Sequence, residues 1–411
     1  MATPKLRFKE FDGDWTSKQL GKIIGISSAS RVFKEQWQDS GVPFFRTSDV
    51  VSIFKNKENE KAYISLELFE ELAKKSGKIK QGDLLVTGGG SIGIPYLVPN
   101  DQPLYFKDAD LLWMKSSGIV EGSFLYNFFI SPKFREYLKS ISHTGTISHF
   151  TIEQAKATPF GFPSKEEQTK IASFLSNVDE KISQLTQKHA LLSQYKQGMM
   201  QKLFSQQLRF KADDGSEFGE WEEKILKDLF PKIRNGFVGV ATPYYVNYGV
   251  KYLQGKNIKN GKIDATGLIF INQEFHQKKT NSILKTNDIL MVQSGHVGEC
   301  AVVTEDYDNA NCHALLVLSP KSSKLINSKF VVYYFYSEIG KKKIALIKTG
   351  NTIEHILASD IKEVALLFPC LAEQTKIANF LSAIDQKIEV VAQQIEQAKT
   401  WKKGLLQQMF V

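Results

Sequence analysis

The chain has 411 residues, 42% of them hydrophobic, which is enough for about two to four domains with real cores. Its three cysteines are too few and too irregularly spaced for a disulfide scaffold or a zinc site. No apolar run approaches the roughly 18 residues of a membrane span, and the N-terminus has no apolar signal core, so we expect a cytoplasmic protein. A net charge of +9, spread evenly, is compatible with a polyanionic partner and also with a generally basic protein.

The first 161 residues contain short, mixed apolar runs that predict an α+β domain. Leu84, Leu85 and Val86 follow the turn residue Asp83 and predict a buried strand. Residues 124–137 carry aromatic and apolar side chains at helical spacing. Between them, Thr87 to Ser91 form a glycine-rich turn without the lysine of a phosphate-binding loop.

Residues 162–204 predict one long helix. Pro163 suits a helix start, and no proline follows it within the segment. Apolar residues recur at alternating steps of three and four, a period typical of a helix that wraps a partner helix, and only His189 and Lys196 interrupt the series. Buried in such a seam, these two side chains would need partners or would fix the helix register.

The second half of the chain repeats the first. Residues 368–410 match residues 162–204 without a gap, with 19 of 43 positions identical at a constant offset of 206, and Lys402 falls in the second seam. The preceding segments repeat more loosely: Trp221 corresponds to Trp15, and residues 289–292 to the first buried strand. Residues 329–347 again have helical spacing, and Tyr333, Tyr334, Phe335 and Tyr336 there favour core and rim positions over base stacking. A repeat this long decides the architecture.

The predicted fold is mixed α+β, with two similar domains that alternate with two long helices. The helices pair as an antiparallel coiled coil and give the chain an internal pseudo-twofold axis; one long core helix in each domain is the alternative. The predicted boundaries are residues 1–161, 162–206, 207–367 and 368–411. The predicted seam contains Ile171, Leu175, Val178, Ile182, Leu185, Leu192, Ile377, Leu381, Ile384, Ile388, Val391 and Ile395.

A pseudo-twofold object with diverged domains suits double-stranded DNA, whose own twofold axes lie perpendicular to the helix axis. The two long helices have changed less than the domains, which indicates that the helices share one task while the domains contact different targets. Such a chain should therefore read two unlike half-sites.

At EQTKIASFLSNVDEKI and EQTKIANFLSAIDQKI, the chain resembles the specificity subunits of type I restriction–modification enzymes. The resemblance covers the whole chain, and the pattern P-x-x-x-E-Q-x-x-I occurs twice, at residues 163–171 and 369–377. The family's Gly-Asp-Leu/Ile-Leu strand is also present, although Asn287 replaces the glycine in the second copy.

The resemblance implies a non-catalytic subunit that reads a bipartite DNA site and sets its spacer with the helix pair. It implies two methyltransferase subunits and motor–nuclease subunits as partners, with S-adenosylmethionine, ATP and Mg bound by those partners and no cofactor or metal in this chain. The sequence agrees, since it contains no Asn/Asp-Pro-Pro-Tyr/Phe motif and no phosphate-binding loop. A scaffold without DNA contacts, a silent specificity cassette and a stand-alone methyltransferase or nuclease are the alternatives.

Base-edge contacts need arginine or amide side chains, and phosphate contacts need lysines, hydroxyls or backbone amides. Loops at corresponding places in the two domains supply such residues. In the first domain the candidates for DNA binding are Arg46, Thr47, Ser48, Lys55, Lys57, Thr87, Gly89, Ser91, Thr144, Thr146, Ser148 and His149. In the second domain they are Gln254, Lys256, Asn257, Lys259, Gln293, Ser294, His296, Lys348, Asn351, Thr352 and His355. We hypothesise that Arg46, Gln254 and Asn257 read bases, while the other turns hold phosphates or the fold.

Overall fold

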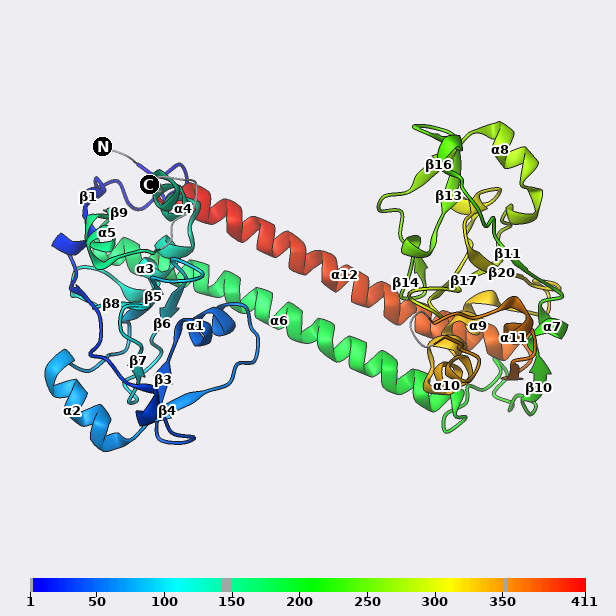
Figure 1. Cartoon of the computed structure of the whole chain (residues 1–411), viewed down its shortest axis with the longest axis horizontal. Coiled ribbons are helices and arrows are strands. Elements are labelled where there is room, and N and C mark those ends of the chain that lie inside the picture. Colours follow the sequence, from blue (N-terminus) through cyan, green and yellow to red (C-terminus); the bar gives the residue numbers. More distant parts are fainter. Residues whose placement is uncertain (1–2, 142–148, 351–353) are drawn as a thin grey trace. The chain divides into compact units, whose positions relative to one another are not determined.

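A computed structural model describes residues 3–141, 149–350 and 354–411. The chain divides into two compact units, one made of residues 1–186 and 393–411, the other of residues 187–392. Each unit contains one α+β domain and a segment of both long helices, α6 (Lys165–Phe204) and α12 (Leu371–Met409) (Figure 1). At about 1.5 Å per residue, helices of 40 and 39 residues are each about 60 Å long.

Within its described residues, the first unit contains nine strands in three sheets. The strands are β1 (Thr16–Gln19), β2 (Ile26–Ser27), β3 (Val42–Phe45), β4 (Ala62–Ile64), β5 (Leu84–Thr87), β6 (Pro95–Leu97), β7 (Tyr105–Phe106), β8 (Leu111–Met114) and β9 (Pro159–Phe162). They form sheets in the orders β2-β8-β5-β6, β4-β3-β7 and β1-β9. The short helices are α1 (Thr47–Phe54), α2 (Leu66–Ser76), α3 (Gly122–Ile130), α4 (Pro132–Ser140) and α5 (Ile152–Ala157).

The second unit repeats this topology with additions. Its strands are β10 (Glu222–Ile225), β11 (Lys232–Asn235), β12 (Tyr245–Val246), β13 (Val250–Leu253), β14 (Ile258–Lys259), β15 (Lys262–Ile263), β16 (Ile269–Ile271), β17 (Ile289–Val292), β18 (Cys300–Val302), β19 (Asn311–Cys312), β20 (Leu315–Ser319) and β21 (Ala365–Phe368). The sheet β11-β20-β17-β18 corresponds to β2-β8-β5-β6. The short helices are α7 (Leu226–Leu229), α8 (Gln273–Lys278), α9 (Ser328–Tyr336), α10 (Glu338–Leu346) and α11 (Ala358–Lys362).

Both predicted buried strands are confirmed, since every residue of β5 and β17 is buried. The two stretches of helical spacing differ from the prediction, because each is a pair of short helices. Ser131 ends α3 and caps α4, and Ser337 does the same between α9 and α10. A serine hydroxyl that accepts a backbone N–H starts a new helix where the periodicity alone suggests continuity.

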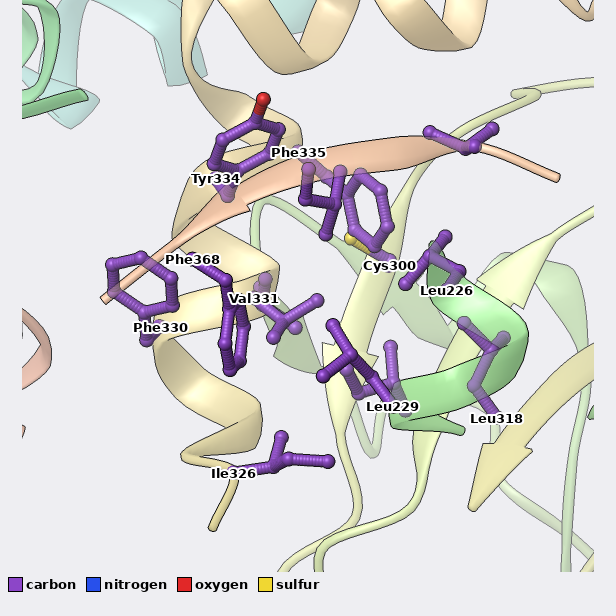
Figure 2. Close-up of a cluster of buried hydrophobic side chains, with 14 of the residues drawn as sticks. Leu226, Leu229, Cys300, Leu318, Ile326, Phe330, Val331, Tyr334, Phe335 and Phe368 are labelled. Atoms are coloured by element: carbon purple, nitrogen blue, oxygen red, sulfur yellow. The ribbon is translucent and has the colours of Figure 1, made fainter. Parts of the chain in front are cut away.

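One hydrophobic core of the second unit lies around α9. Tyr334 and Phe335 are buried there, which confirms the core position predicted for this aromatic run. Figure 2 shows side chains of α9 facing those of α7, β18, β20 and β21; the labelled residues are Leu226, Leu229, Cys300, Leu318, Ile326, Phe330, Val331, Tyr334, Phe335 and Phe368.

The two long helices pack together in an antiparallel sense. In the first unit, Ile171 and Leu175 near the start of α6 share a core with Leu405 and Met409 near the end of α12. In the second unit, the end of α6 packs on the first turns of α12, where Leu203 joins the core of Leu381. The residues of the predicted seam are all buried or half-buried. The antiparallel helix pair is therefore confirmed.

An ion pair joins the first domain to the start of α6. Arg7 donates from Nε and Nη2 to the two carboxylate oxygens of Glu167 at 2.8 and 2.7 Å. Trp15 Nε1 also donates to Glu167, whose carboxylate is 1% exposed. The neighbouring Gln168 donates to the carbonyls of Pro163 and Ile119. A buried carboxylate needs such partners, because an unpaired charge is costly in the interior.

The second unit contains the same joint. Arg209 donates from Nε and Nη2 to the two oxygens of Glu373 at 3.1 and 2.8 Å, and Trp221 Nε1 donates to Glu373 at 3.0 Å. Gln374 donates to the carbonyls of Pro369 and Leu325. These contacts give the repeated Glu-Gln pair a physical role. The glutamate binds the segment before the domain, and the glutamine joins the proline before the long helix to the loop before α3 or α9. From the sequence, this pair was recognisable only as a repeated motif.

Candidate nucleic-acid interface

The glycine-rich turn after β5 is held by the Thr87 hydroxyl and by a backbone hydrogen bond to Asp110. Thr87 is fully buried; its hydroxyl donates to the Ser91 carbonyl and accepts from the Ile94 amide. The Gly88 amide donates to the Asp110 carbonyl at 2.8 Å, and a Cβ on Gly88 would lie 2.8 Å from the Phe150 carbonyl oxygen. The glycine thus allows a close backbone approach, and Thr87 has a structural role in the turn.

His149 lies against this turn. Gly89 and His149 form an isolated antiparallel bridge, and the Phe150 amide donates to the Gly88 carbonyl at 2.7 Å. His149 and Ser91 are exposed, whereas Gly89 is buried. The structure therefore brings together two predicted loops that are about 60 residues apart in the sequence and leaves His149 and Ser91 accessible at their junction.

The first turn of α1 borders the same turn. A Cβ on Gly90 would lie 3.8 Å from Thr47 Cγ2, and the Thr47 hydroxyl donates to the Asp110 carbonyl at 3.4 Å. Ser48 is exposed at the second position of α1, and Lys55 and Lys57 are exposed at and beyond its end. Thr47 thus lies beside the glycine turn, next to Gly90.

Arg46 has partners within the domain. Its Nε donates to Asp49 Oδ2 at 2.9 Å, its Nη2 donates to the Glu60 carbonyl, and its guanidinium lies 5.6 Å from the Trp37 ring centroid. The hydrogen bond with the Asp49 carboxylate raises the pKa of Arg46. A side chain held in this way presents a fixed guanidinium, which suits recognition only if its remaining donors face the ligand.

The second unit builds a matching junction after β17. Ser294 and His355 form an isolated antiparallel bridge, and the Ile356 amide donates to the Gln293 carbonyl at 3.0 Å. Ser294, His296 and His355 are exposed. Lys348, next to this junction, is half-buried and pairs with Glu354 at 2.8 Å. The backbone arrangement repeats that of the first unit, while the exposed side chains differ.

The loop after β13 corresponds to the Arg46 loop. Gln254 Nε2 donates to the Tyr245 hydroxyl at 3.1 Å. Asn257 is fully buried, and its amide donates to the Asp264 and Thr266 carbonyls while its oxygen accepts from the Gln254 amide. Burial gives Asn257 a role within this turn, so it is a poorer candidate for reading a base than Gln254.

The lysines of this loop are exposed. Lys256 lies in the short turn, and Lys259 Nζ pairs with Asp264 Oδ2 at 3.0 Å. Hydrogen bonds from Thr266 and from Lys259 lower the pKa of Asp264 to about 2. Both lysines remain accessible at the surface, where a phosphate could be contacted.

Five candidates lie outside the described residues: Thr144, Thr146, Ser148, Asn351 and Thr352. The flanking His149 and His355 are described, and each makes the backbone bridge to its turn.

An exposed apolar segment of the second domain was not among the predicted site residues. Val238, Val240 and Tyr248 are 66%, 75% and 90% exposed. Tyr245 of the same segment accepts a hydrogen bond from the Gln254 side chain. Lys279 Nζ lies 5.0 Å from the Phe237 ring centroid at the base of the segment. The sequence signal for this segment lies between Gly236 and Gly249, where apolar residues follow neither a strand nor a helix period.

The three cysteines differ in burial. Cys300 and Cys312 are buried and Cys370 is exposed, and all three are free thiols. Next to Cys312, the Nδ1 atom of His313 lies 3.0 Å from the Tyr252 hydroxyl. Burial raises the pKa of Cys312 to about 12 and lowers that of His313. No helix within residues 3–141, 149–350 and 354–411 has the length and apolar character of a membrane span.

A protein-family comparison matches both halves of the chain. The model described as "Type I restriction modification DNA specificity domain" matches residues 12–194 and again residues 219–400. The two matches cover most of both domains and of the long helices.

Individual relatives support the same assignment. The MjaVIII specificity subunit of a type I restriction enzyme from Methanocaldococcus jannaschii is 28% identical over 69% of this chain and 68% of its own. The MjaIX specificity subunit of the same organism is 24% identical over 97% of this chain and 94% of its own. Both relatives are named as specificity subunits of type I restriction enzymes.

Solved structures share the fold. A type I restriction–modification S subunit from M. genitalium superposes with a TM-score of 0.59 at 16% identity, covering 100% of this chain and 99% of its own. A chain from a structural study of complex assembly and conformational transition of the type I R-M system gives 0.60 at 17% identity, covering 97% of each chain.

Proposed function

Because the chain belongs to the family of type I restriction–modification DNA specificity subunits, which are non-catalytic, we propose that its two domains read the two halves of a split, asymmetric DNA site. The first domain takes one half-site and the second takes the other. Unspecified base pairs separate them.

The matching junctions carry this proposal. The Gly89–His149 and Ser294–His355 bridges occur at equivalent places in the two domains, which indicates one backbone scaffold. The exposed side chains on that scaffold differ, with Ser91 and His149 in one domain and Ser294, His296 and His355 in the other. One scaffold with two chemistries suits two different half-sites, because base readout depends on side-chain donors and acceptors.

Within this proposal the loops divide into base-reading and phosphate-binding parts. Gln254 and Arg46 lie in corresponding loops and carry the side chains suited to adenine and guanine edges, respectively. Lys55, Lys57 and Lys256, all exposed, would contact phosphates.

The helix pair would set the spacer and bind the catalytic partners. In this proposal two methyltransferase subunits dock on the helices, and motor–nuclease subunits join the complex in the cytoplasm. S-adenosylmethionine, ATP and Mg belong to those partners. The solved relative from a study of type I complex assembly supports this reading by its fold.

Methylation sequencing tests the proposal. The chain is produced with its methyltransferase partner in a host without methylation of its own, and methylated adenines are mapped across the genome. We expect a split motif with two unlike halves. A chimera that carries residues 207–367 of another family member should change one half of the motif and preserve the other.

Three outcomes would contradict the proposal. An assembled complex with an unmethylated genome would favour a scaffold or a silent cassette. A motif that changes in both halves when one domain is exchanged would refute the assignment of one half-site to each domain. Methyl transfer by the purified chain alone would indicate a stand-alone enzyme.

A further inference from the structure

Each long helix carries one lysine in its mainly apolar seam; the seam of α6 also contains His189. These residues, Lys196 in α6 and Lys402 in α12, occupy equivalent positions of the repeat. An ammonium group in a helix seam is costly to bury, so its partner determines what the position does. In both units that partner is an aspartate of the opposite helix.

In the second unit, Lys196 pairs with Asp385 of α12. The Nζ–Oδ1 distance is 2.6 Å, and the two side chains are 22% and 21% exposed. The Tyr333 hydroxyl of α9 donates to the other oxygen, Asp385 Oδ2, at 2.6 Å. Lys196 Nζ also lies 5.3 Å from the Tyr333 ring centroid. Asp385 thus connects both long helices to the second domain.

The first unit contains the equivalent pair in reverse. Lys402 of α12 donates from Nζ to both oxygens of Asp179 of α6, at 2.6 and 2.7 Å. The two side chains are 17% and 47% exposed. Asp179 and Asp385, like the two lysines, are 206 residues apart, so each helix supplies the lysine of one pair and the aspartate of the other.

The apolar seam alone does not define how far the helices slide along each other. A shift by one heptad would again place apolar residues opposite apolar residues. The same shift would place Lys196 opposite Ala378 or Ala392, and Lys402 opposite Ala172 or Thr186. Each half-buried ammonium would then lose its carboxylate, so the two pairs penalise every heptad shift at both ends.

We propose that the Lys196–Asp385 and Lys402–Asp179 pairs fix the register of the helix pair and thereby determine the spacer length of the DNA site. The spacer part rests on the proposed function, whereas the register part does not. The four residues are positioning residues in this role, since they act through the register of the two long helices.

Zero-length cross-linking tests the register directly. A carbodiimide activates an aspartate carboxylate, and the neighbouring lysine amine displaces the urea leaving group to form an isopeptide bond. In the full chain bound to its methyltransferase partner, we expect linked peptides that join Lys196 to Asp385 and Lys402 to Asp179. Links from these lysines mainly to other carboxylates would overturn the register assignment.

Charge removal and charge exchange test whether the two ion pairs determine the spacer length. Asp179→Asn with Asp385→Asn keeps the side-chain shapes but removes both charges; we expect methylation at the native spacer to fall about tenfold, with sites of other spacer lengths gaining methylation. Exchanging each pair, as in Lys196→Asp with Asp385→Lys and Lys402→Asp with Asp179→Lys, should restore the native spacer. The matched controls, Lys188→Asp and Lys403→Asp, alter exposed lysines of the same helices and should leave the spacer unchanged.

The outcomes distinguish a failure of the register proposal from a failure of the proposed function. An unchanged spacer and unchanged methylation in the double asparagine variant would overturn the role of the pairs in spacing. If the wild-type complex methylates no split motif, the proposed function fails, while the cross-links still decide the register. If the asparagine variant does not fold, the charge-exchanged variant decides, because failure to regain the native spacer in a folded protein would contradict the proposal.

Discussion

The two halves of this chain agree closely where a domain meets its long helix and differ where the domain loops are exposed. At the helix starts, Arg7–Glu167 and Arg209–Glu373 make the same bidentate contact, and a tryptophan indole donates to each glutamate. At the loops, the eight-residue helix α1 of the first domain corresponds to a short turn and the β14–β15 hairpin in the second.

The difference between helix starts and loops indicates which parts of the two halves have the same role. Buried charges tolerate few changes, because the loss of either partner leaves the other charge unpaired in the interior. Exposed loop residues have no such restriction, so they can diverge while the backbone bridges beneath them persist. The helix starts therefore form a common frame, and the loops give each domain its own specificity.

The largest effect should come from breaking one joint. Arg209→Ala leaves the Glu373 carboxylate, which is fully buried, without its cation, and we expect a loss of about 3–5 kcal/mol in the free energy of unfolding. Urea denaturation measures it. Lys211→Ala, which breaks an exposed pair with Glu217, is the control and should cost about 0–1 kcal/mol.

Arg7→Ala breaks the equivalent ion pair of the first half, and we expect it to lower the free energy of unfolding by a similar amount. A loss below about 1 kcal/mol in either arginine variant would show that the joint contributes no more than a surface pair.

The turns after β5 and β17 should tolerate substitution unequally. Gly88→Ala places a methyl group 2.8 Å from the Phe150 carbonyl oxygen, and we expect a destabilisation of about 1–3 kcal/mol. Gln293→Ala, at the corresponding place, shortens a half-buried side chain and should change stability by less than about 0.5 kcal/mol. Thermal unfolding compares the two, and equal losses would contradict the view that only the first turn depends on a close backbone approach.

The base-reading hypothesis predicts one affected position in one half-site. Gln254→Ala should reduce discrimination at a single base of the second half-site by about 1–3 kcal/mol and leave the first half-site unchanged. Arg46→Ala should do the same in the first half-site. DNA binding to a panel of single-base variants measures both, with Lys211→Ala as a control.

A uniform loss of affinity for every DNA sequence would assign the substituted residue to phosphate binding or to the fold. For Arg46 the contacts with Asp49 and Glu60 make this second outcome informative, since they already give the side chain a role within the domain.

The cysteines, which all lie in the second half, should affect how stability depends on pH. Burial raises the pKa of Cys312 from 9.0 to about 12. Below pH 9 the thiol is protonated in both the folded and the unfolded chain, so its contribution is fully present; as the pH rises toward 12, only the unfolded chain loses the proton and stability falls.

Cys312→Ala should therefore show a flatter decline of stability between pH 9 and pH 11 than the wild type, even though the substitution lowers stability at pH 7. Parallel pH profiles of the wild type and Cys312→Ala would contradict the raised pKa of Cys312.

In the folded wild type, a thiol reagent at neutral pH should modify Cys370 much faster than Cys300 and Cys312, because Cys370 alone of the three is exposed.

Several features were accessible from the sequence because they depend on local periodicity or on the internal repeat. The offset of 206 residues gave the two-domain architecture, the steps of three and four gave the helix seams, and Lys196 stood out as a polar residue that needs a partner. The strand after Asp83 was also predictable, since short apolar runs after a turn are typical of buried strands.

The tertiary structure decided which distant residues meet. Arg7 and Glu167 are 160 residues apart, and nothing in the spacing of either indicates the other. Asn257 had the residue type of a base reader, yet its burial became visible only when the turn around it was in place. The partner of Lys196 was likewise undetermined until the antiparallel helices placed Asp385 beside it. Local patterns define elements, whereas pairing across the chain depends on how these elements pack together.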